Sequence, residues 1–342
     1  MRAVFASIAL IAAFAPPAAA GTIHVPGDQP TITIGLAYAG SGDTVLVAAG
    51  TYTESGLGLH GGATLRGATG DPADVIIDCG GLGRVLYCEE MEAGTRVEAV
   101  TVTGGHISDA AGMRIGHASV DLADCVFTGN VADTYGGGVY LPYEDSQATF
   151  TRCVFEDNEA GTGGAGVFAW SAAGVTFTDC TFVGNSAGLY GGGVEIYDTE
   201  CTFTGCTFVA NEAVLYGGGI YLDTCTATLE RVLIVDSADG GAMYVSGCPG
   251  LSVGCCDLWN NLNNGAAADW VAPYDGELGA NGNISSDPLF CGIDGSGNHY
   301  LRSDSPCSPA ISGCGLPIGA WPVGCEDTAA RDATWTAVKQ LY

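Results

Sequence analysis

The stretch that decides the fold is Val120-Asp121-Leu122-Ala123-Asp124-Cys125-Val126-Phe127-Thr128-Gly129-Asn130. Its pattern, apolar–x–apolar–x–x–Cys–x–Phe–x–x–Asn, recurs at intervals of 24 to 28 residues, while the internal offsets of 2, 3, 2 and 3 stay the same. The later copies begin at Ala148, Val175 and Cys201, and two looser copies begin at Ala227 and Leu251. A constant register with a variable period indicates a solenoid of stacked coils, in which one stretch is fixed in space and the loops vary.

A second repeated segment follows a cluster of glycines in each coil. The segment Gly136-Gly137-Gly138-Val139-Tyr140-Leu141 is echoed at 164–169, 191–196 and 217–222. Short stretches of period-two alternation, broken by Gly and Asn, predict strands rather than helices. We therefore predict an all-β, single-stranded right-handed parallel β-helix of about nine coils with caps at both ends. The right hand is inferred by analogy with the crossover rule.

Equivalent residues of successive coils should stack at the strand spacing of about 4.8 Å. One expected column is an interior aromatic ladder, and a second is a ladder of turn amides that hydrogen-bond from coil to coil. The ladders consist of Phe127, Phe155, Phe182 and Phe208, and of Asn130, Asn158, Asn185 and Asn211.

The chain divides into four expected segments. Residues 1–20 have the positive end, apolar run and small-residue cleavage site of a signal peptide. Residues 21–72 should form the N-terminal cap and first coil, with a short helix from Thr31 to Ala39. Residues 73–262 should form the β-helix repeats, and residues 263–342 the C-terminal cap and tail. The last residues, 334–342, could form a helix that docks on the cap, or an export or anchoring signal.

The charge balance limits the possible partners. The chain has 38 Asp+Glu but only 10 Lys+Arg, which gives a formal net charge of −28. Nucleic acids and anionic membranes need basic patches, so neither is an expected partner. No stretch after the signal approaches the ~20 apolar residues of a membrane span, so no span is expected in the mature chain. We expect a secreted protein, or one on the outer surface of a bacterial cell. No cofactor is expected, although the acidic surface would suit Ca²⁺.

The 15 cysteines fall into two groups. Cys125, Cys153, Cys180, Cys206 and Cys256 share one inward column and should behave as small buried hydrophobic residues. The disulfide candidates lie elsewhere: Cys225 with Cys248, Cys79 with Cys88, and the group Cys291, Cys307, Cys314 and Cys325. No C-x-x-C pair occurs and the five histidines are scattered, so no metal site is predicted.

The alternation of F-x-x-N with GG-[GA]-[VI] resembles the repeats of the chlamydial polymorphic outer-membrane proteins. The resemblance covers about residues 100–260 and implies a surface-exposed, adhesin-like β-helix. The chain departs from that family because it has no C-terminal segment long enough for a translocating barrel.

The two ends resemble bacterial right-handed β-helix proteins of the pectate-lyase-like superfamily. The matching stretches are Ile23-His24-Val25-Pro26 with Gly42-Asp43-Thr44-Val45 near the start, and Asp287-Pro288-Leu289-Phe290 near the end. The superfamily includes enzymes that act on polysaccharides, but these residues are architectural and a shared fold does not carry activity.

No catalytic residues are identified from the sequence. The hydrolase signatures of that superfamily are absent, and Arg114-Ile115-Gly116-His117 only faintly resembles one of them. A polysaccharide lyase would need acidic residues for calcium and an Arg or Lys base, and a hydrolase would need paired carboxylates.

The predicted binding site lies on outward positions after the glycine corner. Aromatic rings there could stack on the apolar faces of sugars while carboxylates bond the hydroxyls. Alternatively, the aromatic residues only pack on their neighbours and improve the sheet. The candidate residues are Tyr140, Phe168, Trp170, Glu195, Tyr197, Asp198, Tyr221 and Asp223.

We therefore predict a secreted or cell-surface binding module, adhesin-like or glycan-binding, whose partner is a glycan or a protein on a host or neighbouring surface. The alternative is an extracellular polysaccharide lyase or hydrolase. A third hypothesis, binding to an ice lattice, rests on three stacked threonine pairs: Thr149 with Thr151, Thr176 with Thr178, and Thr202 with Thr204.

Overall fold

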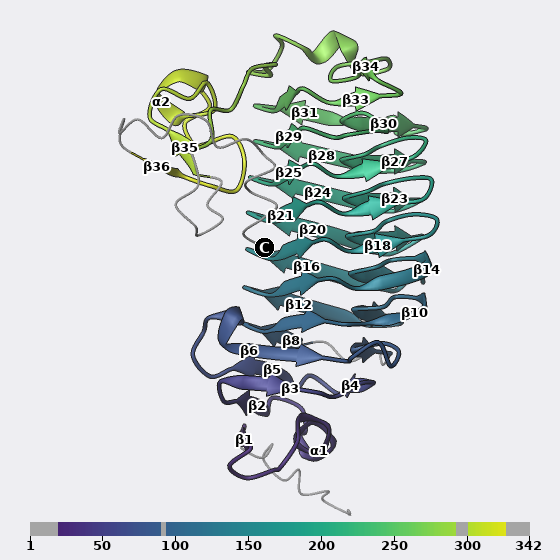
Figure 1. The fold of residues 1–342 in the computed structure, drawn as a ribbon, viewed down its shortest axis with the longest axis vertical. Helices are drawn as coiled ribbons and strands as arrows, with labels where there is room; N and C mark the ends of the chain where they lie inside the picture. Colours follow the sequence, from purple (N-terminus) through teal and green to yellow (C-terminus); the bar gives the residue numbers. More distant parts are fainter. Residues whose placement is uncertain (1–19, 90–93, 292–299, 326–342) are drawn as a thin grey trace, which may run out of the picture.

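The computed structural model describes residues 20–89, 94–291 and 300–325. Their parallel strands stack into one long column that makes about eleven turns (Figure 1). The all-β parallel solenoid predicted from the repeats is confirmed. The longest sheet has ten strands, so the column is slightly longer than the expected nine coils. The first coil begins with the strand at Thr22–Val25, which the repeat pattern did not reveal.

Two sheets are formed by the repeated motif itself. Sheet A has ten strands: β1 Thr22–Val25, β2 Thr44–Val47, β5 Thr64–Gly67, β8 Thr95–Glu98, β12 Ser119–Ala123, β16 Gln147–Thr151, β20 Gly174–Thr178, β24 Glu200–Thr204, β28 Thr226–Glu230 and β31 Ser252–Gly254. Sheet B has nine: β3 Gly50–Tyr52, β6 Val75–Asp78, β9 Thr101–Thr103, β13 Val126–Thr128, β17 Val154–Glu156, β21 Thr181–Val183, β25 Thr207–Val209, β29 Leu233–Val235 and β32 Asp257–Trp259.

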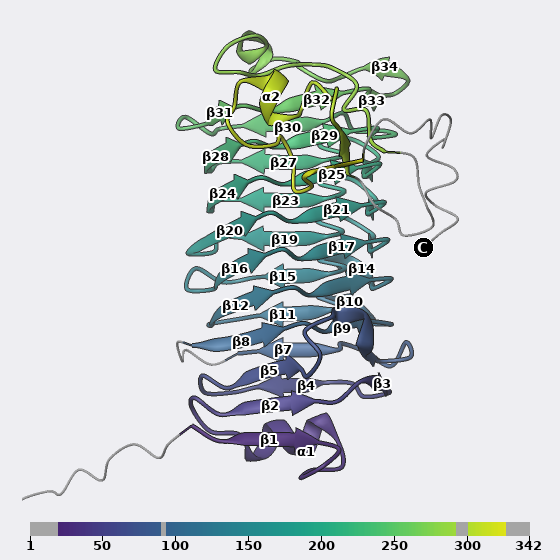
Figure 2. The same ribbon diagram turned by 90° about the vertical axis from the view of Figure 1, so that its left-hand side faces the viewer.

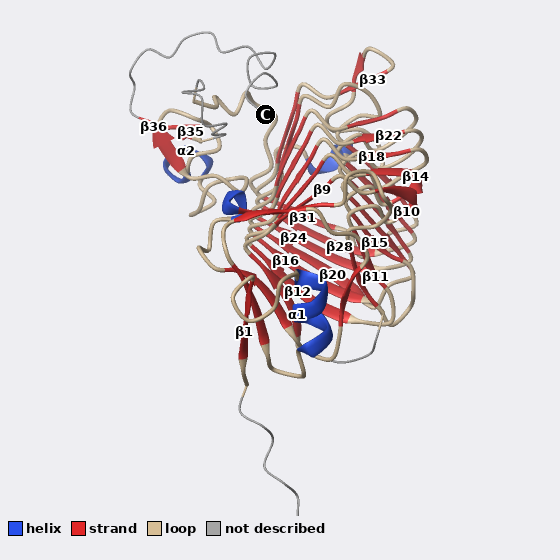
Figure 3. Ribbon diagram, turned by 60° about the horizontal axis from the view of Figure 1, so that its bottom comes forward, coloured by secondary structure: helices blue, strands red, loops and turns tan. Residues whose placement is uncertain are grey.

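The other two sheets follow in each full coil, in the order A, B, D, C. Sheet C has eight strands: β4 Leu57–Leu59, β7 Leu86–Cys88, β11 Met113–Ile115, β15 Val139–Leu141, β19 Val167–Trp170, β23 Val194–Tyr197, β27 Ile220–Asp223 and β30 Met243–Ser246. Sheet D has five short strands: β10 His106–Asp109, β14 Val131–Tyr135, β18 Glu159–Ala160, β22 Ser186–Ala187 and β26 Glu212–Ala213. Sheet D lies on one side of the coil cross-section (Figure 3).

The N-terminal end is covered by helix α1, Ile32–Tyr38, which confirms the expected capping helix. Thr31 is its N-cap, and the Thr31 hydroxyl accepts a hydrogen bond from the Ile34 amide at 3.2 Å. The Glu54 carboxylate accepts from the amides of Ile32 and Thr33, each at 2.8 Å. These acceptors satisfy amides of the first turn, which have no partner within the helix.

The core of the column is built from stacked phenylalanines. Consecutive rings in the ladder of Phe127, Phe155, Phe182 and Phe208 are nearly parallel, with centroids 5.3, 4.7 and 4.5 Å apart. A second ladder, Phe150, Phe177 and Phe203, lies in sheet A with centroids 5.0 and 4.8 Å apart. All seven rings are fully buried, so the predicted interior ladder is confirmed.

The asparagine ladder is also confirmed. The side-chain amide of each member donates to Oδ1 of the next: Asn130 to Asn158 at 3.0 Å, Asn158 to Asn185 at 2.9 Å, and Asn185 to Asn211 at 2.8 Å. The same amide group donates to a carbonyl of the coil below, as from Asn185 to Phe155 at 2.9 Å. Because these polar groups are fully buried, an unpaired member would carry a large desolvation cost.

Glycine is required at the corner before sheet C for two reasons. Gly164 has a φ of +61°, which a residue with a Cβ adopts with strain. At Gly166, a Cβ would collide with the carbonyl oxygen of Gly193 in the next coil. The glycine clusters seen in the sequence therefore permit close approach between coils.

The residues after β32 first form a cap on the last coil. The hairpin of β33 Leu262–Asn263 and β34 Ala266–Ala267, and the 3₁₀ turn η2 at Asp275–Glu277, pass over the upper end of the column (Figures 1 and 2). Tyr274 is buried in the main core and donates a hydrogen bond to the carbonyl of Met243. These residues cap the last coil.

A second 3₁₀ turn, η1 at Pro72–Asp74, lies before β6.

A small lobe then lies against the outer face of sheet B, in a place that the sequence did not predict (Figure 2). It contains β35 Leu301–Arg302, α2 Pro309–Ser312 and β36 Val323–Cys325. Leu301, Cys307 and Ile318 of the lobe pack on outward apolar side chains of sheet B, which are Val183, Val209, Leu233 and Val235. The Cys307 thiol donates to the buried carboxylate of Asp257 at 3.0 Å, and burial raises the pKa of Asp257 to about 6.

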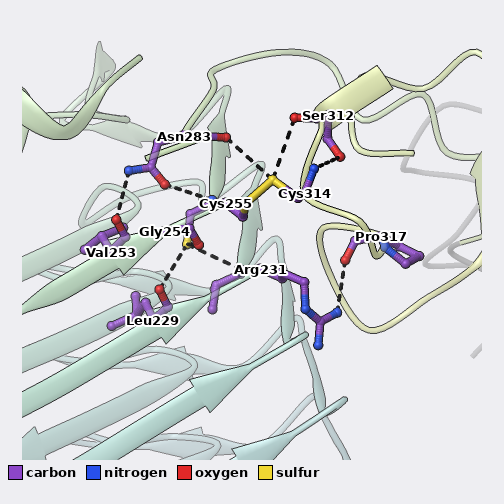
Figure 4. The surroundings of a disulfide bond; sticks show 12 residues. Leu229, Arg231, Val253, Gly254, Cys255, Asn283, Ser312, Cys314 and Pro317 are labelled. Carbon is purple, nitrogen blue, oxygen red and sulfur yellow. Dashed lines mark hydrogen bonds between the residues drawn. A yellow bond between two sulfur atoms is a disulfide. The ribbon is translucent and has the colours of Figure 1, made fainter. Parts of the chain in front are cut away.

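A disulfide between Cys255 and Cys314 ties the lobe to the turn before β32 (Figure 4). Nearby, Arg231 donates to the carbonyl of Pro317 at 3.1 Å. Cys314 was among the predicted disulfide candidates, but its partner was missed. Cys291, another candidate, is also disulfide-bonded. The pairing suggested for Cys79 is wrong, because the buried Cys79 thiol donates to the carbonyl of Gly83 at 3.2 Å.

The inward cysteine column consists of buried thiols, as predicted: Cys125, Cys153, Cys180, Cys206 and Cys256. The expected signal peptide at 1–20 lies outside the described residues except for residue 20. The expected tail helix at 334–342 lies wholly outside them. Within the part that is described, no helix is long and apolar enough to cross a membrane.

Replacing Asn185 by alanine should lower the free energy of unfolding by about 2–4 kcal/mol, because buried donors of Asn158 and the Phe155 carbonyl would lose their partners. Urea denaturation of the mature chain measures this change. Gln147→Ala, at an exposed position of β16, is the matched control and should change stability by less than about 0.5 kcal/mol. Equal effects of the two substitutions would contradict the importance of the ladder.

Candidate binding site on sheet C

The outer face of sheet C has two columns of side chains. The first, named here the central column, is Tyr87, Arg114, Tyr140, Phe168, Glu195, Tyr221 and Tyr244, which are paired in register from β7 to β30. The second, the edge column, is Trp170, Tyr197, Asp223 and Ser246 at the ends of β19, β23, β27 and β30. The sequence predicted that Tyr140, Phe168, Glu195 and Tyr221 stack in successive coils, and the strand register confirms it.

The expected exposure of the central column is wrong for three residues. Tyr140, Phe168 and Glu195 are only 7%, 4% and 7% exposed. The cause is the chain between sheets D and C, where Tyr135, Gly163, Tyr190 and Tyr216 form bridges from coil to coil. Tyr135 stacks on Phe168 with 4.9 Å between ring centroids. A segment of backbone therefore covers the middle of the predicted platform.

Glu195 is a buried carboxyl group in this covered region. A Cβ at Gly163 would overlap the Glu195 carboxylate, so the covering backbone lies directly against it. Among the described residues, Glu195 Oε2 has no hydrogen-bond partner. Burial, and secondarily the charge of Asp223, raise the pKa of Glu195 to about 8. The side chain is therefore largely neutral at pH 7 and acts as a part of the supporting layer.

At the upper end of the central column, its members Tyr221 and Tyr244 pack against Tyr190 and Tyr216 of the covering segment. Tyr221 lies 5.1 Å from Tyr190 and 4.9 Å from Tyr244, and Tyr216 lies 4.7 Å from Tyr244, all between ring centroids. Tyr221 is half-buried, and burial with the nearby Asp223 carboxylate raises its pKa. These contacts agree with packing of aromatic residues on a β surface.

The edge column keeps the exposure that a ligand needs. Trp170 and Tyr197 are 44% and 40% exposed, and their rings meet edge-to-face with centroids 6.5 Å apart. Asp198 follows in the next turn and is exposed, and its Oδ2 accepts from the Ser171 hydroxyl at 3.1 Å. Asp223, in register with Tyr197, is half-buried. The structure thus brings together Trp170, Tyr197, Asp198 and Asp223 at one accessible edge.

A polar cluster at the lower end of sheet C was missed by the sequence reasoning. Arg114 donates to the Glu89 carboxylate at 2.9 Å and to the Tyr143 hydroxyl at 2.7 Å. His117 stacks on the Tyr143 ring at 4.1 Å, and its Nδ1 lies 2.9 Å from the Asp145 carboxylate. Arg114-Ile115-Gly116-His117 was seen in the sequence, but Asp145 comes from the next coil, 28 residues later. Only the stacking of the coils reveals that His117 and Asp145 lie side by side.

The predicted threonine ranks are present on the outer face of sheet A. Thr149, Thr176 and Thr202 form one column, and Thr151, Thr178 and Thr204 form the other. Thr228 extends the first column, while Glu230 ends the second. Ice binding by these ranks stays a prediction.

Comparison with known proteins agrees with this architecture. Residues 90–258 match the family model described as "Right handed beta helix region". This part of the chain is a right-handed β-helix. The right hand, which was inferred by analogy from the sequence, is thus supported. A search of curated protein sequences finds no match.

Two solved structures of pectin methylesterase from Aspergillus niger are similar to the β-helix chain. The penultimately deglycosylated form is 17% identical. Its match covers 68% of this chain and 81% of the esterase chain, with a TM-score of 0.45. The deglycosylated form is 15% identical, and its match covers 69% of this chain and 87% of the esterase chain, with a TM-score of 0.41. Likeness at this level carries no information on the chemistry of a site.

No group of three or more His, Cys, Asp or Glu side chains is placed to hold a metal ion among the residues that the structure describes. Ca²⁺ binding therefore stays a prediction from the acidic composition. The geometry of sheet C instead offers aromatic faces and hydrogen-bond acceptors at one end, and a histidine–carboxylate pair beside an arginine at the other.

Glu195→Gln should stabilise the chain at alkaline pH. The folded state holds the carboxyl proton more tightly than the unfolded state, so the free energy of unfolding falls as pH rises from 4.5 to about 8. The free energy of unfolding of the variant should equal that of the parent at pH 4 and exceed it by about 2–5 kcal/mol at pH 9. Denaturation at several pH values tests this. Glu200→Gln, exposed in the next strand, is the control and should leave the pH profile unchanged.

Proposed function

We propose that this protein is an extracellular or cell-surface binding module that holds a glycan at the edge column of sheet C. The observation that carries the proposal is the pair of exposed rings, Trp170 and Tyr197, on neighbouring coils beside Asp198 and Asp223. The signal-like residues 1–20 and the disulfide between Cys255 and Cys314 support a location outside the cytoplasm.

The chemistry of the edge column suits a sugar. A pyranose ring has an apolar face that can stack on Trp or Tyr, and hydroxyl groups at its rim that can donate to carboxylates. The covered central column supports the Trp170 ring, because Phe168 contacts it at 6.5 Å between centroids, and Trp170 in turn meets Tyr197. A site supported by packed side chains loses less entropy on binding than a mobile one.

The charge of the chain favours a neutral glycan. The net charge is −28, Asp198 directly follows Tyr197 in the chain, and Asp223 is in register with Tyr197. An acidic polysaccharide would approach against this charge, and the repulsion would be strongest at low salt. A neutral glycan on another cell surface would also be compatible with an adhesin-like role.

The double variant Trp170→Ala/Tyr197→Ala should lose retention by neutral polysaccharides in affinity electrophoresis. Removing two stacking rings should weaken the free energy of binding by about 1–3 kcal/mol, which is roughly fivefold to 150-fold in affinity. Tyr38→Ala removes an exposed ring at the far end of the column and is the matched control. Circular dichroism checks that each variant is folded.

A panel of β-glucans, mannans, xylans, polygalacturonate and alginate would identify the ligand class. Retention of the parent chain by a neutral member, lost in the double variant and kept in Tyr38→Ala, is the expected result. Equal retention of all three proteins would exclude the edge column as the binding site.

A second candidate function, hydrolysis or elimination on a polysaccharide, is favoured by the cluster at the lower end of sheet C. Asp145 bonds Nδ1 of His117 and so orients the ring, while Nε2 has no hydrogen bond among the described residues. A histidine held in this way can accept or donate a proton, and Arg114 beside it can hold an anionic group. The His117 side chain is 51% exposed, so a substrate could reach it.

Turnover would be seen as reducing sugar or unsaturated ends released from the same polysaccharide panel. If the cluster is catalytic, His117→Ala should lower the rate by roughly 10²–10⁴-fold, while His24→Ala, exposed near the N-terminus, should not change it. Retention by a polysaccharide without release of either product would favour the binding module and exclude the catalytic function for that panel.

A further inference from the structure

Two cysteines in the turns between sheets C and A approach closely at the upper end of the column. Cys225 follows β27 and Cys248 follows β30, one coil apart. Their sulfur atoms are 2.6 Å apart, and the Cys225 amide donates to the Cys248 sulfur at 3.3 Å. Sulfur atoms that are not bonded normally remain well beyond this distance, whereas a disulfide needs about 2.05 Å.

We propose that Cys225 and Cys248 are an oxidation site, which closes to a disulfide that joins the last two coils of sheet C. Strands β27 and β30 are already paired in register over four residues, from Ile220 with Met243 to Asp223 with Ser246. The bond requires a sulfur movement of only about half an ångström, because the paired backbones hold both turns in place.

The two sulfurs differ in access, which decides how the bond forms. Cys225 is buried, with 4% of its surface exposed. Cys248 is half-buried and lines an open pocket of about 460 Å³, together with Pro249, Tyr274 and Glu277. A small disulfide or the active-site disulfide of an oxidoreductase can therefore reach Cys248 first.

The reaction is a thiol–disulfide exchange in two steps. The Cys248 thiolate attacks a disulfide R–S–S–R, forming Cys248–S–S–R and releasing one R–S⁻. The Cys225 sulfur then attacks the Cys248 sulfur and releases the second R–S⁻. Both leaving thiolates take up the protons lost by the two cysteines, so the chain is oxidised by two electrons and R–S–S–R is reduced to two thiols.

A third thiol, that of Cys201, is the competing partner. Cys201 is in register with Ala227, so it lies one coil below the Cys225 turn. Interaction with the Cys201 thiol, followed by burial, raises the pKa of Cys225, and burial raises the pKa of Cys248 to about 12. Both thiols are therefore protonated at neutral pH. The first attack should become faster as pH rises from 7 to 9.

The disulfide would protect the upper end of the solenoid. Terminal coils have a neighbour on one side only and therefore open more easily than central coils. Cys255–Cys314 already attaches the side lobe to the following turn. A bond between Cys225 and Cys248 would hold β30 on β27 beneath the cap formed by Tyr274.

Chymotrypsin provides a direct test, because it separates the three cysteines. Cleavage after Tyr, Phe, Trp and Leu places Cys201 in residues 198–203, Cys225 in 223–229 and Cys248 in 245–251. The full chain, treated with oxidised glutathione and alkylated without reduction, is digested and analysed by mass spectrometry. The expected product is 223–229 linked to 245–251. The link between 252–258 and 302–335, which carries Cys255–Cys314, is the internal control; Leu316 and Trp321 precede proline and are not cleaved.

Two results of this experiment would contradict the proposed bond between Cys225 and Cys248. Recovery of 223–229 and 245–251 as separate alkylated peptides, with the control link intact, would overturn the proposal. A link between 198–203 and 223–229 would overturn it as well.

A second measurement follows the effect on stability. Oxidised parent should melt several degrees higher than Cys248→Ser, and dithiothreitol should remove this difference. A difference that persists after reduction would show that Cys248→Ser acts through packing and not through the bond.

Discussion

The backbone hydrogen bonds between successive parallel coils are the constraint on which the rest of this structure depends. They hold residues of equal position one above another, so a single amino-acid choice is repeated along the axis. Phenylalanine rings at this spacing stack face to face, and asparagine amides reach from one coil to the next. The same alignment makes each polar group costly to lose, since its partners lie in two neighbouring coils.

Stacking also determines what the outer surface can do. On sheet C, the chain arriving from sheet D lies over Tyr140, Phe168 and Glu195 and converts them into a supporting layer. Only the edge column, where the coil begins its next turn, leaves Trp170 and Tyr197 accessible. A binding surface on this fold is thus confined to the positions that no neighbouring segment covers. On sheet B, three outward valines and Leu233 are buried by the C-terminal lobe.

The sequence was most informative where residues repeat. The Phe and Asn columns, the glycine corners and the helix after Thr31 could all be predicted, because each depends on local conformation or on stacking of like residues. The site was predicted in part. Alternation correctly placed Tyr140 and Phe168 on the outer side of the strand, but it contains no information about a segment that folds over them.

What the sequence by itself determined is the register, since a pattern with constant offsets leaves one way to stack the coils. Only the tertiary structure decided which outward residues meet solvent, that Asp145 pairs with His117, and that Cys314 bonds to Cys255. Each of these depends on the path of an irregular segment between or beyond the strands. Such paths follow from packing across the whole molecule, and no periodicity in the chain records them.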